Sequence, residues 1–120
     1  MKTKKIKVIP LPKLIKKADA VFSRWIRNRD GNKCVICGST DVVQCGHLIK
    51  RGKHGTRFNE RNCNAQCSRC NFKHNHYPEH YTNWFISKWG VGEYRKLIEL
   101  AGKPYKFTRT ELQEIIEGYK

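Results

Sequence analysis

Cys34-Val-Ile-Cys37 and Cys67-Ser-Arg-Cys70 are the two short stretches that decide the fold of this chain. Each offers two sulfurs from a single tight turn, and two such pairs are most simply read as four thiolates that close one tetrahedral zinc site. A site of four thiolates has no open position for water. We therefore expect this zinc to be structural, and any chemistry to use other residues near it.

The composition favours a nucleic-acid partner. The chain has 25 Lys and Arg against 10 Asp and Glu, which gives a formal net charge of +15 on 120 residues. Charge of this sign and size releases counterions from phosphates, so an anionic polymer such as a nucleic acid is the expected partner. The alternative is a generally basic surface without a specific ligand. The length predicts a single domain over 1–120, whose modest core would gain from a metal cross-link.

The cysteines also bear on the compartment. A basic tail is expected over 1–11, and no apolar stretch is long enough to cross a bilayer, so we expect no membrane contact and a cytoplasmic protein. In a reducing cytoplasm, cysteines serve as ligands or buried thiols more often than as disulfides. Cys45 and Cys63 remain after the four ligands are assigned, and we read them as small buried residues; the other interpretation is that they are alternative ligands.

Hydrophobic spacing predicts helices on both sides of a central finger at 34–77. The first helix covers 12–30, where apolar residues recur at three- and four-residue steps: Ile15, Ala18, Phe22, Trp25 and Ile26. Inside the finger, Val42-Val43 and Leu48-Ile49 flank the Gly46-His47 step and suggest a hairpin or two brief strands. The polar segment from Arg51 to Arg61 is expected to be a loop.

The segment 78–120 is expected to be helical. Pro78 suits the start of a helix that ends at Gly90, and a second helix would end at Gly102. Their expected buried residues are Tyr81, Trp84, Phe85 and Trp89 in the first, and Tyr94, Leu97, Ile98 and Ala101 in the second. Thr108 and Glu111 have capping-box spacing, and Phe107 and Leu112 stand where a hydrophobic staple would place them, so a last helix should begin there.

The central residues have the types that phosphodiester hydrolysis requires. The reaction needs a base to activate water, a divalent ion to stabilise charge on the phosphate, and groups that hold both in line. His47 suits the base, because the unperturbed pKa of histidine lies close to neutral pH. Asn62 and Asn71 offer amide oxygens, which suit a hard ion such as Mg²⁺.

The same residues resemble a known family. The chain is similar to the HNH, or His-Me finger, nucleases, and within them to the NinG (Rap) recombination endonucleases of lambdoid phages. The similarity rests on Cys34-x-x-Cys37-Gly38, Gly46-His47, Arg57-Phe-Asn-Glu-Arg-Asn62 and Gln66-Cys67-x-x-Cys70-Asn71. Fainter similarity extends to the helix before Cys34, to Tyr81–Gly90 and to Thr108–Tyr119, so the match covers most of the chain.

The resemblance implies an α+β fold: a zinc-stapled ββα-metal finger flanked by N- and C-terminal helices. In it His47 is the general base, and Asn62 holds the loop and orients the imidazole. Asn71 stands where many relatives carry a histidine and would bind the catalytic Mg²⁺ or Mn²⁺ through its side-chain oxygen. The substrates implied are branched recombination intermediates, such as Holliday junctions and D-loops, in the host cell cytoplasm if the chain is phage-encoded. A homodimer would suit symmetric cutting of a four-way junction.

The chain departs from the family pattern in two places. Many relatives carry a metal-binding Asp directly before the catalytic histidine, where this chain has Gly46. His74 could supply the second ligand instead, as could Asn75 or His76, although each could equally be a surface residue that contacts phosphate. His76-Tyr77 also replaces a Gly-Asn step typical of the family. His54 and His80 are expected to be solvated.

Six basic residues crowd the proposed site and are candidates for phosphate contacts. They are Arg51, Lys53, Arg57, Arg61, Arg69 and Lys73. Two alternatives to a junction nuclease stay open. One is a zinc-stapled DNA-binding module that has lost catalysis, and the other is a nuclease that acts on linear duplex or RNA.

Overall fold

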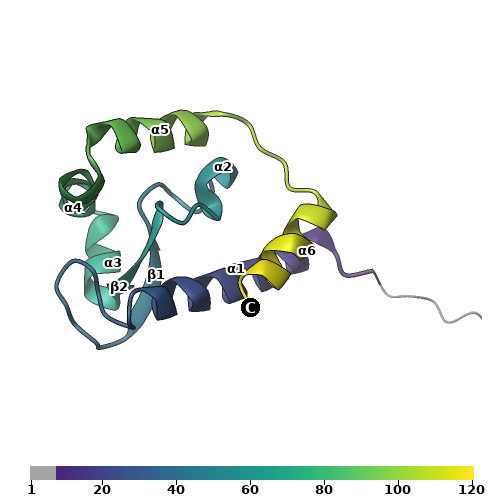
Figure 1. Ribbon diagram of the computed structural model, residues 1–120, viewed down its shortest axis with the longest axis horizontal. Coiled ribbons are helices and arrows are strands. Elements are labelled where there is room, and N and C mark those ends of the chain that lie inside the picture. Colours follow the sequence, from purple (N-terminus) through teal and green to yellow (C-terminus); the bar gives the residue numbers. More distant parts are fainter. Residues whose placement is uncertain (1–7) are drawn as a thin grey trace, which may run out of the picture.

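The computed structural model describes residues 8–120 and has an α+β fold (Figure 1). Most of the basic tail predicted at 1–11 falls on residues 1–7, which lie outside the described residues. The described part contains six helices and one two-stranded antiparallel sheet. In chain order these are α1 (Leu11–Arg29), β1 (Val43–His47), α2 (His54–Arg57), β2 (Cys63–Cys67), α3 (Ser68–His74), α4 (Glu79–Trp89), α5 (Val91–Gly102) and α6 (Arg109–Gly118).

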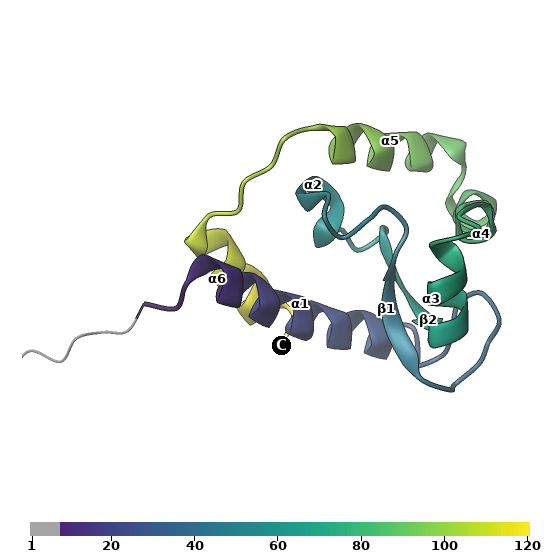
Figure 2. The same ribbon diagram turned by 180° about the vertical axis from the view of Figure 1, so that it is seen from behind.

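Helix α1 packs against both α6 and the sheet. Its buried residues recur at four-residue steps and form one continuous face: Leu14, Ala18, Phe22 and Ile26. The N-terminal half of this face packs with Leu112 and Ile116 of α6, and the C-terminal half packs against Cys63 of β2. Figure 2 shows α6 lying alongside the first turns of α1, with the sheet at the other end.

The strand pairing in the sheet differs from the predicted hairpin. β1 pairs with β2 in antiparallel register, with His47 opposite Cys63 and Val43 opposite Cys67. The pairing partner is therefore Cys63–Cys67 and not Leu48-Ile49, which follows β1 outside the strand. β2 reads Cys-Asn-Ala-Gln-Cys and has little intrinsic strand preference. All five of its residues are buried, so packing against the neighbouring elements decides its conformation.

The loop between the strands also differs from the prediction. The segment from Arg51 to Arg61 contains the short helix α2. Helix α5 lies against it, as both views show, and a Cβ atom on Gly55 would come within 2.6 Å of the Leu100 carbonyl oxygen. This close backbone approach explains a glycine at position 55. The contact between Gly55 and Leu100 thus joins α2 to α5.

Helices α4, α5 and α6 follow the predicted boundaries closely. Tyr81 and Phe85 of α4 pack with Leu97 of α5 and with Leu48. The predicted burial of Trp89 and Ile98 is wrong, because these side chains are 39% and 49% exposed.

The predicted cap of the last helix is confirmed. The Thr108 side chain accepts a 3.1 Å hydrogen bond from the Glu111 backbone N–H, and Phe107 and Leu112 are both buried. No helix within residues 8–120 is long and apolar enough to span a membrane.

Candidate catalytic cavity and zinc centre

Four cysteines converge beside the end of the sheet that lies away from His47. Cys34 and Cys37 belong to the turn after α1, Cys67 ends β2, and Cys70 lies in α3. Their sulfur atoms all lie within 4.8 Å of one another. In a tetrahedral zinc site, bonds of about 2.3 Å place thiolate sulfurs about 3.8 Å apart. These four cysteines could therefore hold a zinc ion.

Backbone hydrogen bonds shape the turn that carries the first cysteine pair. The Gly38 N–H donates to the Cys34 carbonyl at 2.9 Å, and Gly38 has a φ of +77°, which glycine adopts readily. The Val35 N–H donates to the Ala65 carbonyl at 2.8 Å and so joins the turn to β2. Burial tends to raise the pKa of Cys34, but backbone N–H groups, among them that of Cys37, lower it to about 7. One thiolate is thus readily available to a metal.

A cavity of about 720 Å³ opens beside β1. It is bounded by α1, β1, the segment after β1, α3 and the start of α4. The polar and charged residues that line it are Asp19, Ser23, His47, Lys50, Arg51, Lys53, Asn71, His74, Asn75 and Thr82. It thus brings together His47, Asn71 and His74, which the sequence had singled out, with several cationic side chains.

The His47 ring is fixed in one orientation. Its Nε2 lies 3.0 Å from the Arg57 carbonyl oxygen, which can only accept, so Nε2 carries the proton of the neutral ring. The lone pair is then on Nδ1. Burial lowers the pKa of His47, which keeps the ring neutral near physiological pH. A neutral imidazole with a defined lone pair, in a cavity lined by basic residues, can take a proton from water.

Asn62 is fully buried and is not among the residues that line the cavity. Its Oδ1 accepts a 2.8 Å bond from the Ile49 N–H, and its Nδ2 donates to the carbonyls of Ile49 and Thr56 at 3.1 and 3.0 Å. The side chain therefore ties the segment that leaves β1 to helix α2. It makes no hydrogen bond to His47, but the carbonyl that orients His47 belongs to Arg57, the residue after Thr56.

Asn71 and His74 reach the cavity from α3. The Asn71 Nδ2 donates to the Gln44 side chain at 2.9 Å, which leaves its Oδ1 for an ion. The His74 Nε2 lies 2.8 Å from the Leu48 carbonyl, so Nε2 donates, and the buried Nδ1 has no partner among the described residues. An imidazole that donates from one nitrogen and keeps the other free has the form of a metal ligand.

The structure explains why a glycine precedes His47. A Cβ atom at position 46 would lie 1.9 Å from the Gln66 Oε1 and 2.7 Å from the Gln66 Cδ. Gln66 is only 1% exposed and cannot swing into solvent. An aspartate therefore does not fit at position 46 while Gln66 keeps this position.

One carboxylate of the cavity was missed by the sequence reasoning. Asp19 lines the cavity from α1 and accepts from the Arg57 guanidinium, with Nε to Oδ1 at 2.9 Å. It is the single acidic residue of α1, which could have marked it out.

The six candidate phosphate-binding residues fall into two groups. Arg51, Lys53, Arg69 and Lys73 are exposed, and the first two line the cavity. The guanidinium groups of the other two are already engaged: that of Arg57 pairs with Asp19, and that of Arg61 pairs with Glu93 and stacks 4.4 Å from the Trp89 ring centre.

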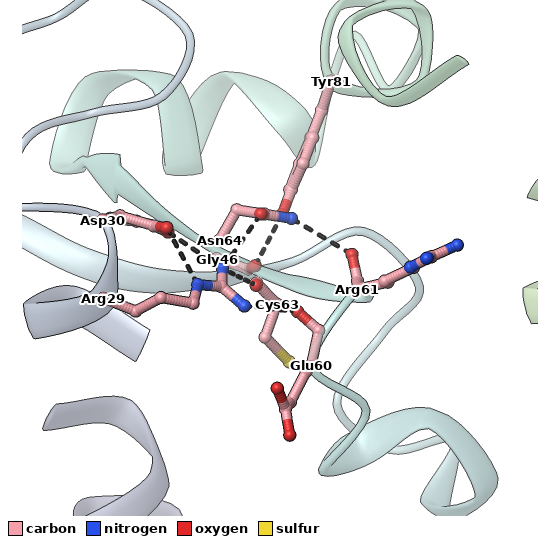
Figure 3. Close-up of polar contacts among 9 residues, drawn as sticks. Arg29, Asp30, Gly46, Glu60, Arg61, Cys63, Asn64 and Tyr81 are labelled. Carbon is pink, nitrogen blue, oxygen red and sulfur yellow. Dashed lines mark hydrogen bonds and ion pairs between the residues drawn. The ribbon is translucent and has the colours of Figure 1, made fainter. Parts of the chain in front are cut away.

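A buried polar network fixes the strands that carry these groups (Figure 3). The Tyr81 hydroxyl donates to the Gly46 carbonyl at 2.8 Å and accepts from the Asn64 Nδ2 at 2.9 Å. Arg29 donates to the Asn64 Oδ1 and the Cys63 carbonyl, at 3.1 and 2.9 Å. The network therefore joins α1, both strands and α4, and it sets the position of β1 next to His47.

The two remaining cysteines lie beside His47. Cys63 is fully buried as predicted, whereas Cys45 is half-buried and lines the cavity. A hydrogen bond from the Cys63 thiol lowers the pKa of Cys45, and the charge of Arg29 adds to this, while burial raises the pKa of Cys63.

The two histidines that were expected to be solvated differ from each other. His80 is exposed as expected. The expected solvation of His54 is wrong, because its half-buried ring packs 4.9 Å from the ring centre of Phe107.

Comparison with known proteins gives one positive finding. The family model described as NinG, Bacteriophage Lambda NinG protein, matches residues 1–120. No curated protein and no solved structure matches the chain.

Proposed function

The chain belongs to the NinG family of bacteriophage lambda, and from this premise we propose that it is a metal-dependent DNA endonuclease that cleaves branched recombination intermediates. Family membership suggests a role related to phage recombination. The nuclease activity is our inference from the cavity. It rests on the residues around His47 and on the charge of the chain.

The observation that carries the proposal is the state of His47. Its Nε2 donates to the Arg57 carbonyl, its pKa is lowered by burial, and its ring lines a cavity with Lys50, Arg51 and Lys53. The cationic side chains attract a phosphodiester, and the Nδ1 lone pair takes the proton from the attacking water. Asn62 acts as a positioning residue through Thr56 and Arg57. The strand order β1, β2 followed by α3 supports a ββα finger.

A divalent ion is part of the proposal. Asn71 would hold it through Oδ1, and the candidates for a second ligand are Asp19, whose carboxylate pairs with Arg57, and His74, whose buried Nδ1 is unpaired among the described residues. Oxygen donors favour Mg²⁺ or Mn²⁺, and the imidazole suits Mn²⁺ better. When bound, such an ion stabilises negative charge on the phosphate and on the leaving 3′-oxygen. Zinc in the four-cysteine site would serve the fold and not the reaction.

The test compares a labelled four-way junction with a linear duplex of the same sequence, each with Mg²⁺, Mn²⁺ or EDTA. We expect cleavage of the junction that requires the ion and that falls at least a hundredfold in His47→Ala, a typical loss for a missing general base. His80→Ala is the matched control, because His80 is exposed on α4. Undiminished cleavage by a folded His47→Ala protein would refute the assignment. Equal cleavage of both DNAs would refute the junction preference alone.

One observation favours a second candidate, a DNA-binding module without catalysis. Gly46 cannot ligate an ion through a side chain, and Gln66 occupies the space where such a side chain would stand. This candidate predicts salt-sensitive binding to the junction without nicking under any divalent ion. The same assay therefore separates the two candidates.

A further inference from the structure

A second group of metal-binding side chains lies at the catalytic end of the sheet. The ligand atoms of Cys45, His47 and Cys63 all lie within 4.8 Å of one another. The register explains this: His47 is directly opposite Cys63, and Cys45 is two residues before His47 on the same face of β1. The group is separate from the four-cysteine cluster, whose strand residue is Cys67, at the far end of β2.

We propose that Cys45, His47 and Cys63 form a second metal site that binds a thiophilic divalent ion such as Zn²⁺, and that occupation of this site removes His47 from catalysis. The metal-binding part stands on the geometry alone. The inhibitory part rests on the proposed nuclease function. Two thiolates and an imidazole are donors that select zinc and similar ions over Mg²⁺.

The geometry suits a four-coordinate ion with one open position. Zinc bonds of about 2.0 to 2.3 Å would bring the donors to about 3.5 to 3.8 Å apart, so each needs to move by about 1 Å or less. Cys45 and His47 line the cavity, whereas Cys63 is fully buried behind them. The ion would thus be reached from the cavity, where its fourth position would face solvent or a phosphate oxygen.

The inhibition follows from the two ring nitrogens of His47. Nε2 lies 3.0 Å from the Arg57 carbonyl oxygen, and the Cys63 sulfur lies 3.5 Å from the same oxygen, so both donors stand next to one backbone carbonyl. An ion on Nε2 displaces its proton, and the neutral ring then carries the proton on Nδ1. An ion on Nδ1 occupies the lone pair directly. In either case the ring can no longer accept a proton from water.

The first experiment measures binding without reference to activity. Co²⁺ is added to the full chain already loaded with zinc at the four-cysteine site, where the weaker-binding Co²⁺ does not displace Zn²⁺. We expect a thiolate-to-cobalt absorption band that saturates at about one equivalent per chain, with the intense visible bands of a tetrahedral site. Cys45→Ala should lose the band, and His47→Ala should weaken it. Ser23→Ala, which alters the same cavity without touching a ligand, should keep it.

Two results would overturn the site. One is the absence of a thiolate band in the zinc-loaded protein, and the other is a band that persists unchanged in Cys45→Ala. Cys45 is half-buried, so its truncation should leave the fold intact, and the far-UV spectrum checks this. Cys63→Ala provides a second test of the same prediction from the opposite strand.

The inhibition is measured in the junction assay with Mg²⁺. At a free Zn²⁺ concentration of about ten times the dissociation constant of the second site, cleavage should slow about tenfold, because only the unoccupied fraction keeps its base. Cys45→Ala should resist this inhibition. A cobalt band without inhibition of an active enzyme would overturn His47 as a ligand. A cobalt band in a protein that never cleaves DNA would support the metal site and refute the proposed function.

Discussion

Replacing Asn62 by alanine tests how much the hydrogen bonds of its side chain stabilise the loop between β1 and β2, which carries the Arg57 carbonyl that orients His47. The Asn62 side chain makes three hydrogen bonds, two with the backbone of Ile49 and one with the Thr56 carbonyl. Alanine removes all three bonds and fills none of the space. The Ile49 N–H, the Ile49 carbonyl and the Thr56 carbonyl then lose their partner at a fully buried side-chain position.

The expected cost follows from the burial of each group. The bond to Thr56 is buried and the two bonds to Ile49 are partly buried. A buried group left without a partner costs about 1 to 3 kcal/mol, and a partly solvated one costs nearer 0.5 to 1 kcal/mol. Together these give a loss of about 3 kcal/mol in the free energy of unfolding. That is a large share of the roughly 5 to 15 kcal/mol available to a domain of this size.

Urea denaturation of the zinc-loaded protein measures this loss. With a slope of about 1.5 kcal/mol per M, the midpoint should fall by about 2 M. Asn59→Ala is the matched control, because its Oδ1 accepts from the N–H groups of Arg61 and Asn62 in the more exposed turn just before, and it should cost about 1 kcal/mol. A midpoint that moves no further for Asn62→Ala than for Asn59→Ala would refute the reasoning.

Three further predictions concern the zinc, the base and the glycine. Complete zinc chelation should unfold the finger, because coordination energy at such a site is folding energy; a far-UV spectrum that keeps its folded shape would contradict the structural role. The pKa of His47 is lowered in the folded state, so between that value and the unfolded pKa of about 6.5 the unfolded chain binds more protons. The free energy of unfolding should therefore fall as the pH drops below about 6.5, and it should fall less steeply in His47→Gln than in the parent protein. If the unfolding midpoints of the two proteins depended equally on pH, the prediction would be wrong. Gly46→Ala should lower the melting temperature, because its Cβ collides with the Gln66 side chain at a cost of about 1 to 3 kcal/mol, and Gln66→Ala in the same chain should recover part of that loss.

The helices were predictable because their signals are local. Four-residue spacing of apolar residues marks α1, and the Thr108 cap with the Phe107 and Leu112 pair marks the start of α6. Exposure was harder to predict than position. Trp89 has the spacing of a core residue, but α5 turns away at Gly90 and Arg61 covers the ring from outside. Its environment depends on a residue distant in the sequence.

Strand β2 could not be found from strand propensity. Its cysteine and alanine residues alternate with Asn64 and Gln66, but all five residues are buried, and their partners are distant in the chain. The Ala65 N–H donates to Asp30 at the end of α1, and Asn64 bridges Arg29 and Tyr81. Such a segment is specified by contacts with three other elements, which no short window of sequence contains.

The residue types of the candidate site could be predicted from the sequence, but the contacts between these residues could not. His47, Asn71 and His74 do line one cavity. Asp19 stands out in the sequence only as the single acidic residue of α1. That signal does not show that Asp19 pairs with the Arg57 guanidinium in the cavity, or that the His47 ring is oriented by the backbone carbonyl of the same arginine. The first contact joins α2 to α1 and the second joins α2 to β1, so both depend on how the loop between the strands folds back.

The sheet separates the two candidate sites, the four cysteines and the cavity around His47. Its register sets Cys67 opposite Val43 at one end and Cys63 opposite His47 at the other, four residues apart along each strand. At about 3.4 Å per residue these ends lie about 14 Å from each other, so an ion among the four cysteines cannot reach the atoms that His47 would act on. A zinc ion there can influence the base only by keeping β2 in register. Any loss of activity on zinc removal should therefore follow the unfolded fraction of the chain at each chelator concentration, and a loss that preceded unfolding would place a metal at the His47 end of the sheet instead.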